Sequence, residues 1–364
     1  MAGHPNRTRR AATLAAAWIL SCLCAAAFAA EPGKLPTVMI LATGGTIAGT
    51  AASSTDTGDY QAAKVGVQGL IEAVPELKKA ANVKGEQLFQ IPSGSITNDH
   101  WLKLAKRVNE LLAQSDVDGI VITHGTDTIE ETAYFLNLVV KSKKPVVITG
   151  SMRPSTAISA DGPINLYDAV TLAASPDAVG KGVLVVLNEQ INGARDVTKT
   201  NSANTDTFRN WELGFMGYMR SNAPHFFHVS TRKHTVDTEF DVSKLDALPQ
   251  VDIVYGYANM NRIAVDAFVA AGAKAIVYAG VGEGSVARPA AEPALIDARK
   301  KDVIIVRSSR VGNGIVARSV EERDDELGYV VADTLNPQKA RILVMLALTK
   351  TQDPKQIQHM FYIY

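Results

Sequence analysis

The sequence predicts an α/β protein with two α/β domains: a larger N-terminal domain with a mainly parallel sheet flanked by helices, and a smaller C-terminal α/β domain. Short apolar runs recur along the chain without the polar alternation of a strand that has one face in water, and they are typical of strands covered on both faces. Segments with helical spacing separate these runs, and this alternation predicts parallel pairing. The runs are residues 38–41, 119–123, 146–149, 183–187, 253–255, 275–279 and 303–306.

The helices are predicted from apolar spacing and from start signals. Apolar side chains recur every three or four residues over 101–112 and 263–271, which is helical spacing. Asp161-Gly162-Pro163 and Asn336-Pro337 each put proline in the first turn of a helix. A further helix is expected over 130–140, because Thr128 and Glu131 have the spacing of a capping box.

A break in the apolar pattern indicates the domain boundary. Residues 222–250 hold few apolar residues, and the strand–helix pattern restarts at Val251. We expect an N-terminal α/β catalytic domain over 35–227, a linker over 228–249 and a C-terminal α/β domain over 250–364. Residues 49–63 are small and polar with one aromatic, which is typical of a mobile lid over a site or of a plain surface loop.

Residues 1–30 have the features of a cleaved signal peptide. Arginines precede an Ala-rich apolar run over 13–28, and Ala27-Phe28-Ala29 fits the small-x-small cleavage pattern. The run is shorter than the roughly 20 apolar residues of a membrane span. A lipid anchor at Cys22 is an alternative, disfavoured by an atypical leucine before Ser21. We therefore expect a periplasmic or secreted protein with no membrane contact in its mature form and, since both cysteines lie in this segment, no disulfide.

Composition excludes several classes of function. Apolar residues make up 46% and charged residues 20% of the chain, as in a globular protein. The 37 basic and 37 acidic residues balance, and no basic run favours a nucleic-acid partner. The sequence has no G-x-S-x-G elbow, no P-loop motif and no HExxH. We therefore expect neither a metal nor a cofactor.

Hydroxyl groups follow the predicted strands in loops that could form a site. Thr46 ends a Gly-rich turn after the first strand, and Thr126-Asp127 follow the strand over 119–123. A threonine hydroxyl needs a base to act as a nucleophile. Lys199, in a polar loop, can be that base only if burial or a neighbouring cation lowers its pKa. Each loop alone is equally typical of a turn or a helix cap, so the chemistry requires that the loops converge.

Two segments resemble the paired signatures of bacterial L-asparaginases. They are Ile-Leu-Ala-Thr-Gly-Gly-Thr-Ile-Ala at 40–48 and Ile-Thr-His-Gly-Thr-Asp-Thr at 122–128. The likeness continues over about residues 35–364, and with the export signal the chain resembles the type II, periplasmic branch, which includes glutaminase-asparaginases. This resemblance implies an amidohydrolase that converts L-asparagine, and also L-glutamine, to the acidic amino acid and ammonia through a threonine nucleophile and an acyl-enzyme. The likeness also covers residues 151–155, 159–167, 193–201, 307–310 and 334–341.

The resemblance also implies roles for the catalytic residues. Thr46 is expected to be the nucleophile, and Tyr60, on the predicted lid, to close over the substrate and help to activate it. Thr126, Asp127 and Lys199 are expected to form a second catalytic group that relays protons. Backbone N–H groups near Thr126 are expected to stabilise the oxyanion, which is usually the largest catalytic contribution.

Substrate binding is implied at further positions. Ser93 and Asp127 are expected to hold the α-carboxylate and α-ammonium groups. The family forms homotetramers, dimers of dimers with sites at subunit interfaces, and Glu321 or its neighbour Glu322 is expected to reach the adjacent subunit's site.

Three positions bear on specificity. Gly94 stands where relatives carry Gln or Glu, so a side chain near the substrate's α-amino end is missing. Ser285 matches relatives that accept glutamine as well as asparagine. Glu283 stands where Asn is usual, which adds a carboxylate near the interface.

Two alternatives remain open at this point. Size, export and the α/β pattern also fit a two-domain periplasmic amino-acid-binding protein without turnover, although this gives no role to Thr126 and Asp127 together with Lys199. A family member whose catalysis has decayed is suggested only by Gly94.

Overall fold

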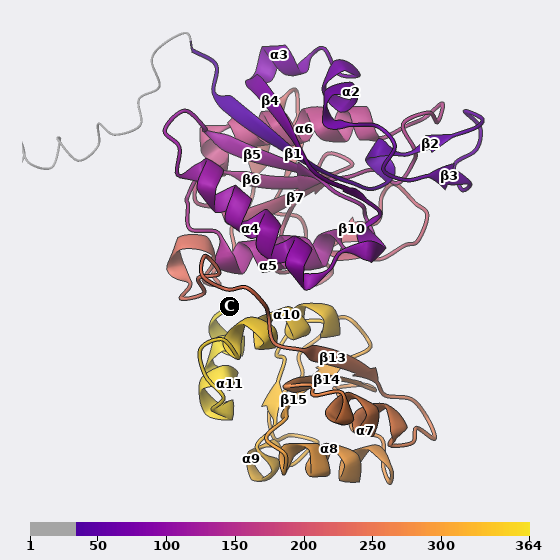
Figure 1. Ribbon diagram of the computed structural model, residues 1–364, viewed down its shortest axis with the longest axis vertical. Coiled ribbons are helices and arrows are strands. Elements are labelled where there is room, and N and C mark those ends of the chain that lie inside the picture. The colour runs from indigo at the N-terminus through magenta and orange to yellow at the C-terminus, as the bar shows by residue number, and fades with distance from the viewer. Residues whose placement is uncertain (1–33) are drawn as a thin grey trace, which may run out of the picture. The chain divides into compact units, whose positions relative to one another are not determined.

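The computed structural model describes residues 34–364, and all elements below lie within one compact unit of residues 36–364 (Figure 1). The expected signal peptide and the alternative anchor at Cys22 lie outside the described residues. The predicted fold class is confirmed, because a large sheet flanked by helices precedes a small parallel sheet. Within the described part of the chain, no helix is long and apolar enough to cross a membrane.

The large sheet has eight strands in the order β12-β11-β8-β7-β6-β5-β1-β4. Its strands from β4 to β7 run parallel, and β8, β11 and β12 pair antiparallel. All eight residues of β1 are buried, as expected for a strand covered on both faces. The strands are β1 (Thr37–Gly44), β4 (Asn82–Ile91), β5 (Gly119–Thr123), β6 (Val146–Thr149), β7 (Val183–Leu187), β8 (Gln190–Gly193), β11 (Gly217–Arg220) and β12 (Ala223–Phe226).

Helices cover both faces of this sheet. One face packs against α4 and α5, where the Trp101 and Phe135 rings stack with their centroids 5.4 Å apart. The other face packs against α2, α3 and α6. The helices are α2 (Val67–Glu72), α3 (Leu77–Ala80), α4 (Asn98–Leu112), α5 (Ile129–Val139) and α6 (Gly162–Ala174).

The small sheet has four parallel strands in the order β13-β14-β15-β16. Helices α7 and α8 share a core with one of its faces, and α10 and α11 lie in the core on the other side. These elements are β13 (Val251–Tyr255), α7 (Ile263–Ala270), β14 (Ala275–Gly280), α8 (Ala291–Arg299), β15 (Ile304–Ser309), α9 (Asp324–Leu327), β16 (Val330–Val331), α10 (Pro337–Ala347) and α11 (Pro354–Ile363).

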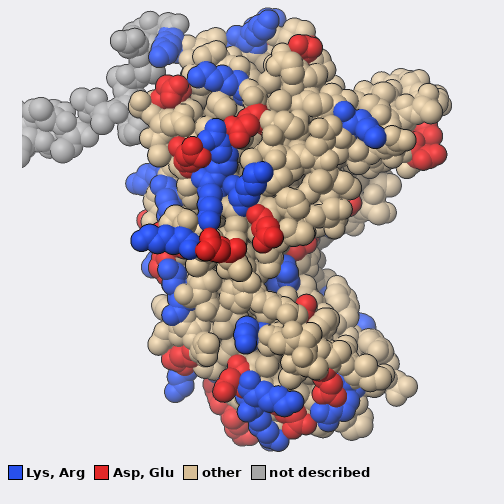
Figure 2. Space-filling model, viewed as in Figure 1, with Lys and Arg blue, Asp and Glu red and all other residues tan. Residues whose placement is uncertain are grey.

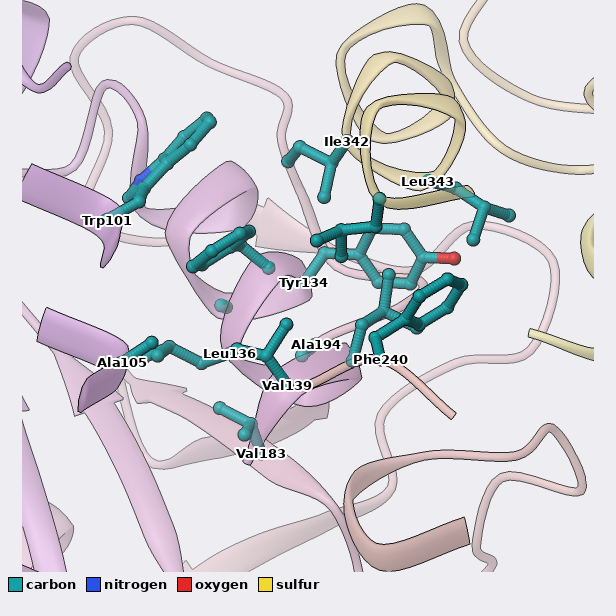
Figure 3. Packing of buried hydrophobic residues seen from close by; sticks show 14 of the residues in the cluster. Trp101, Ala105, Tyr134, Leu136, Val139, Val183, Ala194, Phe240, Ile342 and Leu343 are labelled. Atoms are coloured by element: carbon teal, nitrogen blue, oxygen red, sulfur yellow. The ribbon is translucent and has the colours of Figure 1, made fainter. Parts of the chain in front are cut away.

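Helix α10 joins the two sheets into one unit. Nine of its eleven residues are buried, because it packs on α5 and on the small sheet at the same time. Figure 3 shows Ile342 and Leu343 of α10 near the Tyr134 ring of α5. Each such side chain contributes roughly 1.5–3 kcal/mol on burial. The domain bounds 35–227 and 250–364 stay a prediction, since one core extends across them.

Short elements connect these layers and carry several of the predicted site residues. Two strand pairs stand apart from the large sheet: β2 with β3, and β9 with β10. The 49–63 segment predicted as a lid contains the first pair. The short elements are η1 (Thr46–Ala48), β2 (Thr50–Ala51), β3 (Tyr60–Gln61), η2 (Ser93–Ser95), η3 (Pro176–Ala178), β9 (Thr198–Lys199), β10 (Phe208–Arg209) and η4 (Thr235–Asp237), where η denotes a 3₁₀ helix.

The predicted capping box at the start of α5 is wrong. Thr128 is the N-cap residue, but its side chain makes no cap hydrogen bond with the helix. Its hydroxyl instead donates to the backbone carbonyl of Ser93 at 2.9 Å. The Thr128 side chain is therefore directed to the neighbouring turn instead of to the amides of the first helical turn.

Charged side chains of both signs are mixed on the face of the molecule drawn in Figure 2. Ion pairs account for part of this mixing. Arg107, for example, lies 2.7 Å from a Glu86 oxygen and 2.8 Å from a Glu110 oxygen. Such partly exposed pairs contribute little to stability.

Candidate active site

Three turns meet at the carboxyl ends of β1, β4 and β5, and glycines allow the approach. A Cβ on Gly45, whose φ is +83°, would lie 2.4 Å from the Gly125 backbone, so the turns after β1 and β5 touch through bare backbone. A Cβ on Gly125 would lie 2.5 Å from the Ser93 hydroxyl oxygen. The Gly45 amide also donates to the Ile91 carbonyl at 3.1 Å. The convergence that the sequence could not establish is therefore present, at the edge where parallel sheets bind ligands.

The first hydroxyl at this edge is that of Thr46. Its side-chain oxygen lies 2.7 Å from the Tyr60 hydroxyl, and either group can be the donor. Thr46 is only 8% exposed, at the start of η1. Tyr60 reaches it from β3, and a Cβ on Gly49 would lie 2.9 Å from the Tyr60 ring, so a glycine leaves room for that ring.

The second hydroxyl is that of Thr126, which is 5% exposed. The Lys199 ammonium donates to it at 3.0 Å and to an Asp127 carboxylate oxygen at 2.8 Å. The Lys199 side chain is 16% exposed and the Asp127 side chain 72%, so this pair opens toward solvent on the Asp127 side. The structure thus brings the predicted second group together from loops 72 residues apart.

A buried hydrogen-bond chain supports the backbone just before Thr126. Trp101 Nε1 can only donate, and it donates to the Thr132 hydroxyl at 2.9 Å; that hydroxyl donates in turn to His124 Nε2 at 2.9 Å. His124 Nδ1 then carries the proton and donates to the Gly125 carbonyl at 2.7 Å. Burial lowers the pKa of His124 to about 4, so the ring is neutral near pH 7.

Sequence reasoning assigned no role to His124, although it lies within the quoted 122–128 segment. It missed Glu130 as well. Glu130 is 6% exposed and accepts a hydrogen bond from Thr198, the residue before Lys199. The only signal in the sequence was an ionisable residue next to a predicted site loop. The sequence does not show that this residue is buried, because distant segments bury it.

The predicted binding residues Ser93 and Gly94 lie at this edge of the sheet, in the turn after β4. Ser93 is 4% exposed, and its hydroxyl is beside Gly125. Gly94 is exposed, and a Cβ there would meet no atom within 4 Å. The space that a longer side chain would need is therefore open in this chain.

Ser285 and Glu321 lie elsewhere, in the C-terminal part of the chain. The Ser285 hydroxyl bonds to the Glu321 carboxylate, and in the described residues neither side chain hydrogen-bonds to Thr46 or Thr126. Glu322 is buried and accepts from the Val286 amide at 2.9 Å, whereas Glu321 is exposed. Of the two glutamates, Glu321 is the one whose carboxylate faces solvent.

Glu283 has a local partner. Its carboxylate accepts a hydrogen bond from the Ala317 amide at 3.1 Å. Among residues 34–364, no cluster of three or more His, Cys, Asp or Glu side chains could hold a metal ion.

Family models and curated relatives match most of the chain. Residues 37–232 match the family model "Asparaginase, N-terminal", and residues 250–361 match "Glutaminase/Asparaginase C-terminal domain". The chain is 59% identical over 338 residues to L-asparaginase 2 of Bacillus subtilis, covering 93% of this chain and 89% of that protein. It is 54% identical to the glutaminase-asparaginase of Pseudomonas fluorescens biotype A, covering 91% of each.

A solved structure also matches the chain. The crystal structure of a probable cytoplasmic L-asparaginase from Campylobacter jejuni superimposes with a TM-score of 0.88 at 48% identity, covering 90% of this chain and all of that one. Family models cover most of the chain, and relatives well above 30% identity share nearly its whole described length. The chain belongs to the asparaginase family.

Proposed function

We propose that this protein hydrolyses the side-chain amide of L-asparagine, and also of L-glutamine, to release ammonia and the acidic amino acid. Membership of the family supports hydrolase activity. The observation that carries the proposal is the pair of hydroxyl clusters at one sheet edge: Thr46 with Tyr60, and Thr126 with Lys199 and Asp127. A binding protein without turnover has no use for two such clusters, and nothing favours that alternative.

The proposed reaction begins at Thr46. Its hydroxyl oxygen attacks the amide carbon of the substrate, and its proton leaves through the hydrogen bond with the Tyr60 hydroxyl. The tetrahedral intermediate collapses as the nitrogen gains a proton and departs as ammonia, which leaves an ester on Thr46. Water then attacks the ester and releases the acidic product.

Thr126 and Lys199 form the proposed second relay. In the described geometry Lys199 donates to the Thr126 oxygen, which leaves the Thr126 hydroxyl proton free to point at a reacting group. Backbone N–H groups of the turn around Thr126 are proposed to stabilise the oxyanion. The buried chain through His124 supports this by holding the Gly125 peptide.

Substrate binding is proposed at the turns that follow β1, β4 and β5. One oxygen of the exposed Asp127 carboxylate accepts from Lys199, so the other can receive the substrate's ammonium group. The Ser93 hydroxyl is proposed to hold the carboxylate. Gly94 contributes no side chain, and we expect a weaker grip on the α-amino end than a Gln or Glu would give.

We further propose a homotetramer in which the sites lie at subunit interfaces. The separation of Ser285 and Glu321 from hydrogen-bonding contact with Thr46 supports a role at a neighbouring subunit's site. Ser285 is also the basis for proposing glutamine as a second substrate. Residues 1–30 support export to the periplasm or beyond, and the proposed chemistry needs no cofactor.

The test is to replace Thr46 by Val, which keeps the shape of the buried side chain and removes the hydroxyl. Ammonia release from L-asparagine should fall at least about 10³-fold, since removing a catalytic nucleophile can cost as much as about 10⁶-fold in kcat. Thr43→Val is the matched control, because Thr43 is equally buried and its hydroxyl only donates to the Thr123 carbonyl at 2.9 Å. It should keep most of the activity.

Four substrates sharpen the result. The wild-type protein should release ammonia from L-asparagine and L-glutamine, and more slowly from the D-forms. Tight binding of an amino acid with no turnover would support the binding-protein alternative. Wild-type turnover by a folded Thr46→Val protein would contradict the assignment of the nucleophile.

A further inference from the structure

We propose that Glu130 is a positioning residue that sets where Lys199 stands relative to Thr126, and that it does so by linking the site to helix α10. This inference rests on the proposed function, in which Lys199 and Thr126 act together. Glu130 lies in the first turn of α5, four residues after Thr126, and its carboxylate is almost fully buried. Within residues 34–364, no hydrogen bond or ion pair joins it to Thr46 or Tyr60, and the role proposed for it is exerted through other residues.

Strand β9, which carries Lys199, has little support of its own. It is two residues long and pairs only with β10, outside the large sheet. A two-stranded ribbon of this length is not stable by itself. The position of Lys199 against α5 therefore depends on side-chain contacts between β9 and its surroundings.

Glu130 links α5 to β9 by a side-chain hydrogen bond. The Thr198 hydroxyl donates to one carboxylate oxygen of Glu130 at 3.1 Å. In the strand, Thr198 precedes Lys199, so its side chain and that of Lys199 leave opposite sides of β9. The two side chains thus hold the strand from both sides, Thr198 to Glu130 of α5 and Lys199 to Thr126 in the turn before α5.

Helix α10 fixes the carboxylate from the other side. Asn336 Nδ2 donates to the second oxygen at 3.0 Å, and Gln338 Nε2 donates to the first at 3.3 Å. Since an ionised carboxylate is an acceptor only, it can receive all of these donors at once. A glutamine at position 130 would turn an amide group toward at least one of them.

Lys339 completes this arrangement, which we call the Glu130 network (Glu130, Thr198, Asn336, Gln338 and Lys339). The Lys339 ammonium lies 3.9 Å from the second Glu130 oxygen and is 2% exposed. It donates to the backbone carbonyls of Arg195, at 2.8 Å, and Val197. Burial lowers the pKa of Lys339 to about 8, and the Glu130 charge acts against that shift.

Two links therefore run from α10 to the residues just before Lys199, and the ion pair of Lys339 with Glu130 couples them. One passes through Lys339 to the backbone at 195 and 197, and the other passes through Glu130 to the Thr198 side chain. A buried network in which every member is paired has a single low-energy arrangement. We infer that this network holds the Lys199 ammonium within hydrogen-bond distance of Thr126 before substrate arrives.

The experiment replaces Thr198 by Val, which removes the hydroxyl that β9 donates to Glu130 and changes neither shape nor charge. We expect kcat for L-asparagine to fall roughly 10- to 100-fold, as a displacement of about 1 Å in a catalytic group can cause. KM should change less than threefold, because Thr198 does not meet the substrate. Thr198→Ser keeps the hydroxyl and should restore most of the lost kcat.

The matched control is Thr200→Val. Thr200 is two residues along, and its hydroxyl donates at 2.8 Å to the Thr207 carbonyl, not to α5. It loses the same kind of bond from the same ribbon and should keep kcat within about threefold of wild type. Glu130→Gln is the second variant, with a kcat loss at least as large as that of Thr198→Val and with lower thermal stability, since the buried Lys339 loses its counter-charge.

Wild-type kcat in a folded Thr198→Val protein overturns the proposal, and so does a Thr198→Ser protein that fails to recover activity. Thr46→Val is assayed alongside. Turnover that survives in Thr46→Val refutes the proposed function itself. An inactive Thr46→Val protein together with an unaffected Thr198→Val protein refutes only the positioning role of Glu130.

Discussion

The two hydroxyls of the site are held in different ways. Thr46 has a tyrosine partner on the β2–β3 ribbon, which pairs with no other strand and is mostly exposed over residues 52–59. Thr126 has a lysine partner on β9, an equally short ribbon, but one tied to α5 and α10 by buried groups. The two ribbons are therefore equally short but differ in the buried polar contacts beneath them.

This difference suggests a division of labour at the site. The Tyr60 ribbon is attached through its β2 side to residues 155–158: the Ser155 hydroxyl donates to the Gly49 carbonyl at 2.7 Å, and the Ile158 amide donates to the Ser54 carbonyl at 2.9 Å. A segment with few buried contacts opens at low free-energy cost. On the Lys199 side buried groups hold the ribbon, so we expect substrate to enter past Tyr60 and to meet Lys199 and Thr126 already in place.

The largest effect is expected from Lys199→Met, which removes the ammonium and keeps much of the length of the side chain. A fixed relay cannot be replaced by a neighbouring group, so kcat for L-asparagine should fall about 10³-fold or more. Steady-state ammonia release measures this. Lys84→Met is the control, because the Lys84 side chain is 52% exposed in a surface ion pair and should leave kcat unchanged.

A smaller effect is expected from Tyr60→Phe. The ring still packs beside Gly49, and because Tyr60 is partly exposed a water molecule can take the place of the lost hydroxyl. We expect kcat to fall about 10²-fold, within the usual range for one acid–base group. Tyr255→Phe, at a tyrosine that is 57% exposed, is the control. If Tyr60→Phe and Lys199→Met lose kcat equally, the different support of the two ribbons has no effect on catalysis, which contradicts this comparison.

The fold was predictable where burial produces a simple pattern. The strands over 119–123, 146–149 and 183–187 were predicted with the bounds observed, because each is apolar on both faces. Strands β8, β11 and β12 were missed, since they lie at the sheet's antiparallel end and mix polar with apolar residues. Their pairing depends on tertiary neighbours more than on local sequence.

The site was predictable only in part, for a related reason. The hydroxyl chemistry of loops after predicted strands and the family resemblance both drew attention to Thr46, Thr126 and Lys199, whose roles stay a proposal. It gave no reason to choose Glu130, because the contact that buries its carboxylate is made by Asn336, 206 residues away. The tautomer of His124 likewise depends on Trp101 and Thr132, which belong to different helices.

The smallest expected effect concerns acid stability on the preorganised side. Burial lowers the pKa of His124 from 6.5 to about 4 in the folded protein, so between these values the unfolded chain binds a proton that the folded chain does not. Stability must therefore rise with pH in this window and fall on acidification. From pH 7 to pH 5 the loss from His124 alone is about 2 kcal/mol of unfolding free energy.

Urea unfolding at the two pH values measures this loss, with His124→Asn as the comparison protein. The asparagine keeps one donor and one acceptor but does not titrate, so its stability should change about 2 kcal/mol less between pH 7 and pH 5 than that of the wild type. The variant is expected to be less stable at pH 7, which does not affect the difference. An equal change in unfolding free energy in both proteins would mean that His124 binds its proton in the folded state. A charged His124 could not accept from the Thr132 hydroxyl, so the proposed hydrogen-bond chain from Trp101 to Gly125 would be wrong.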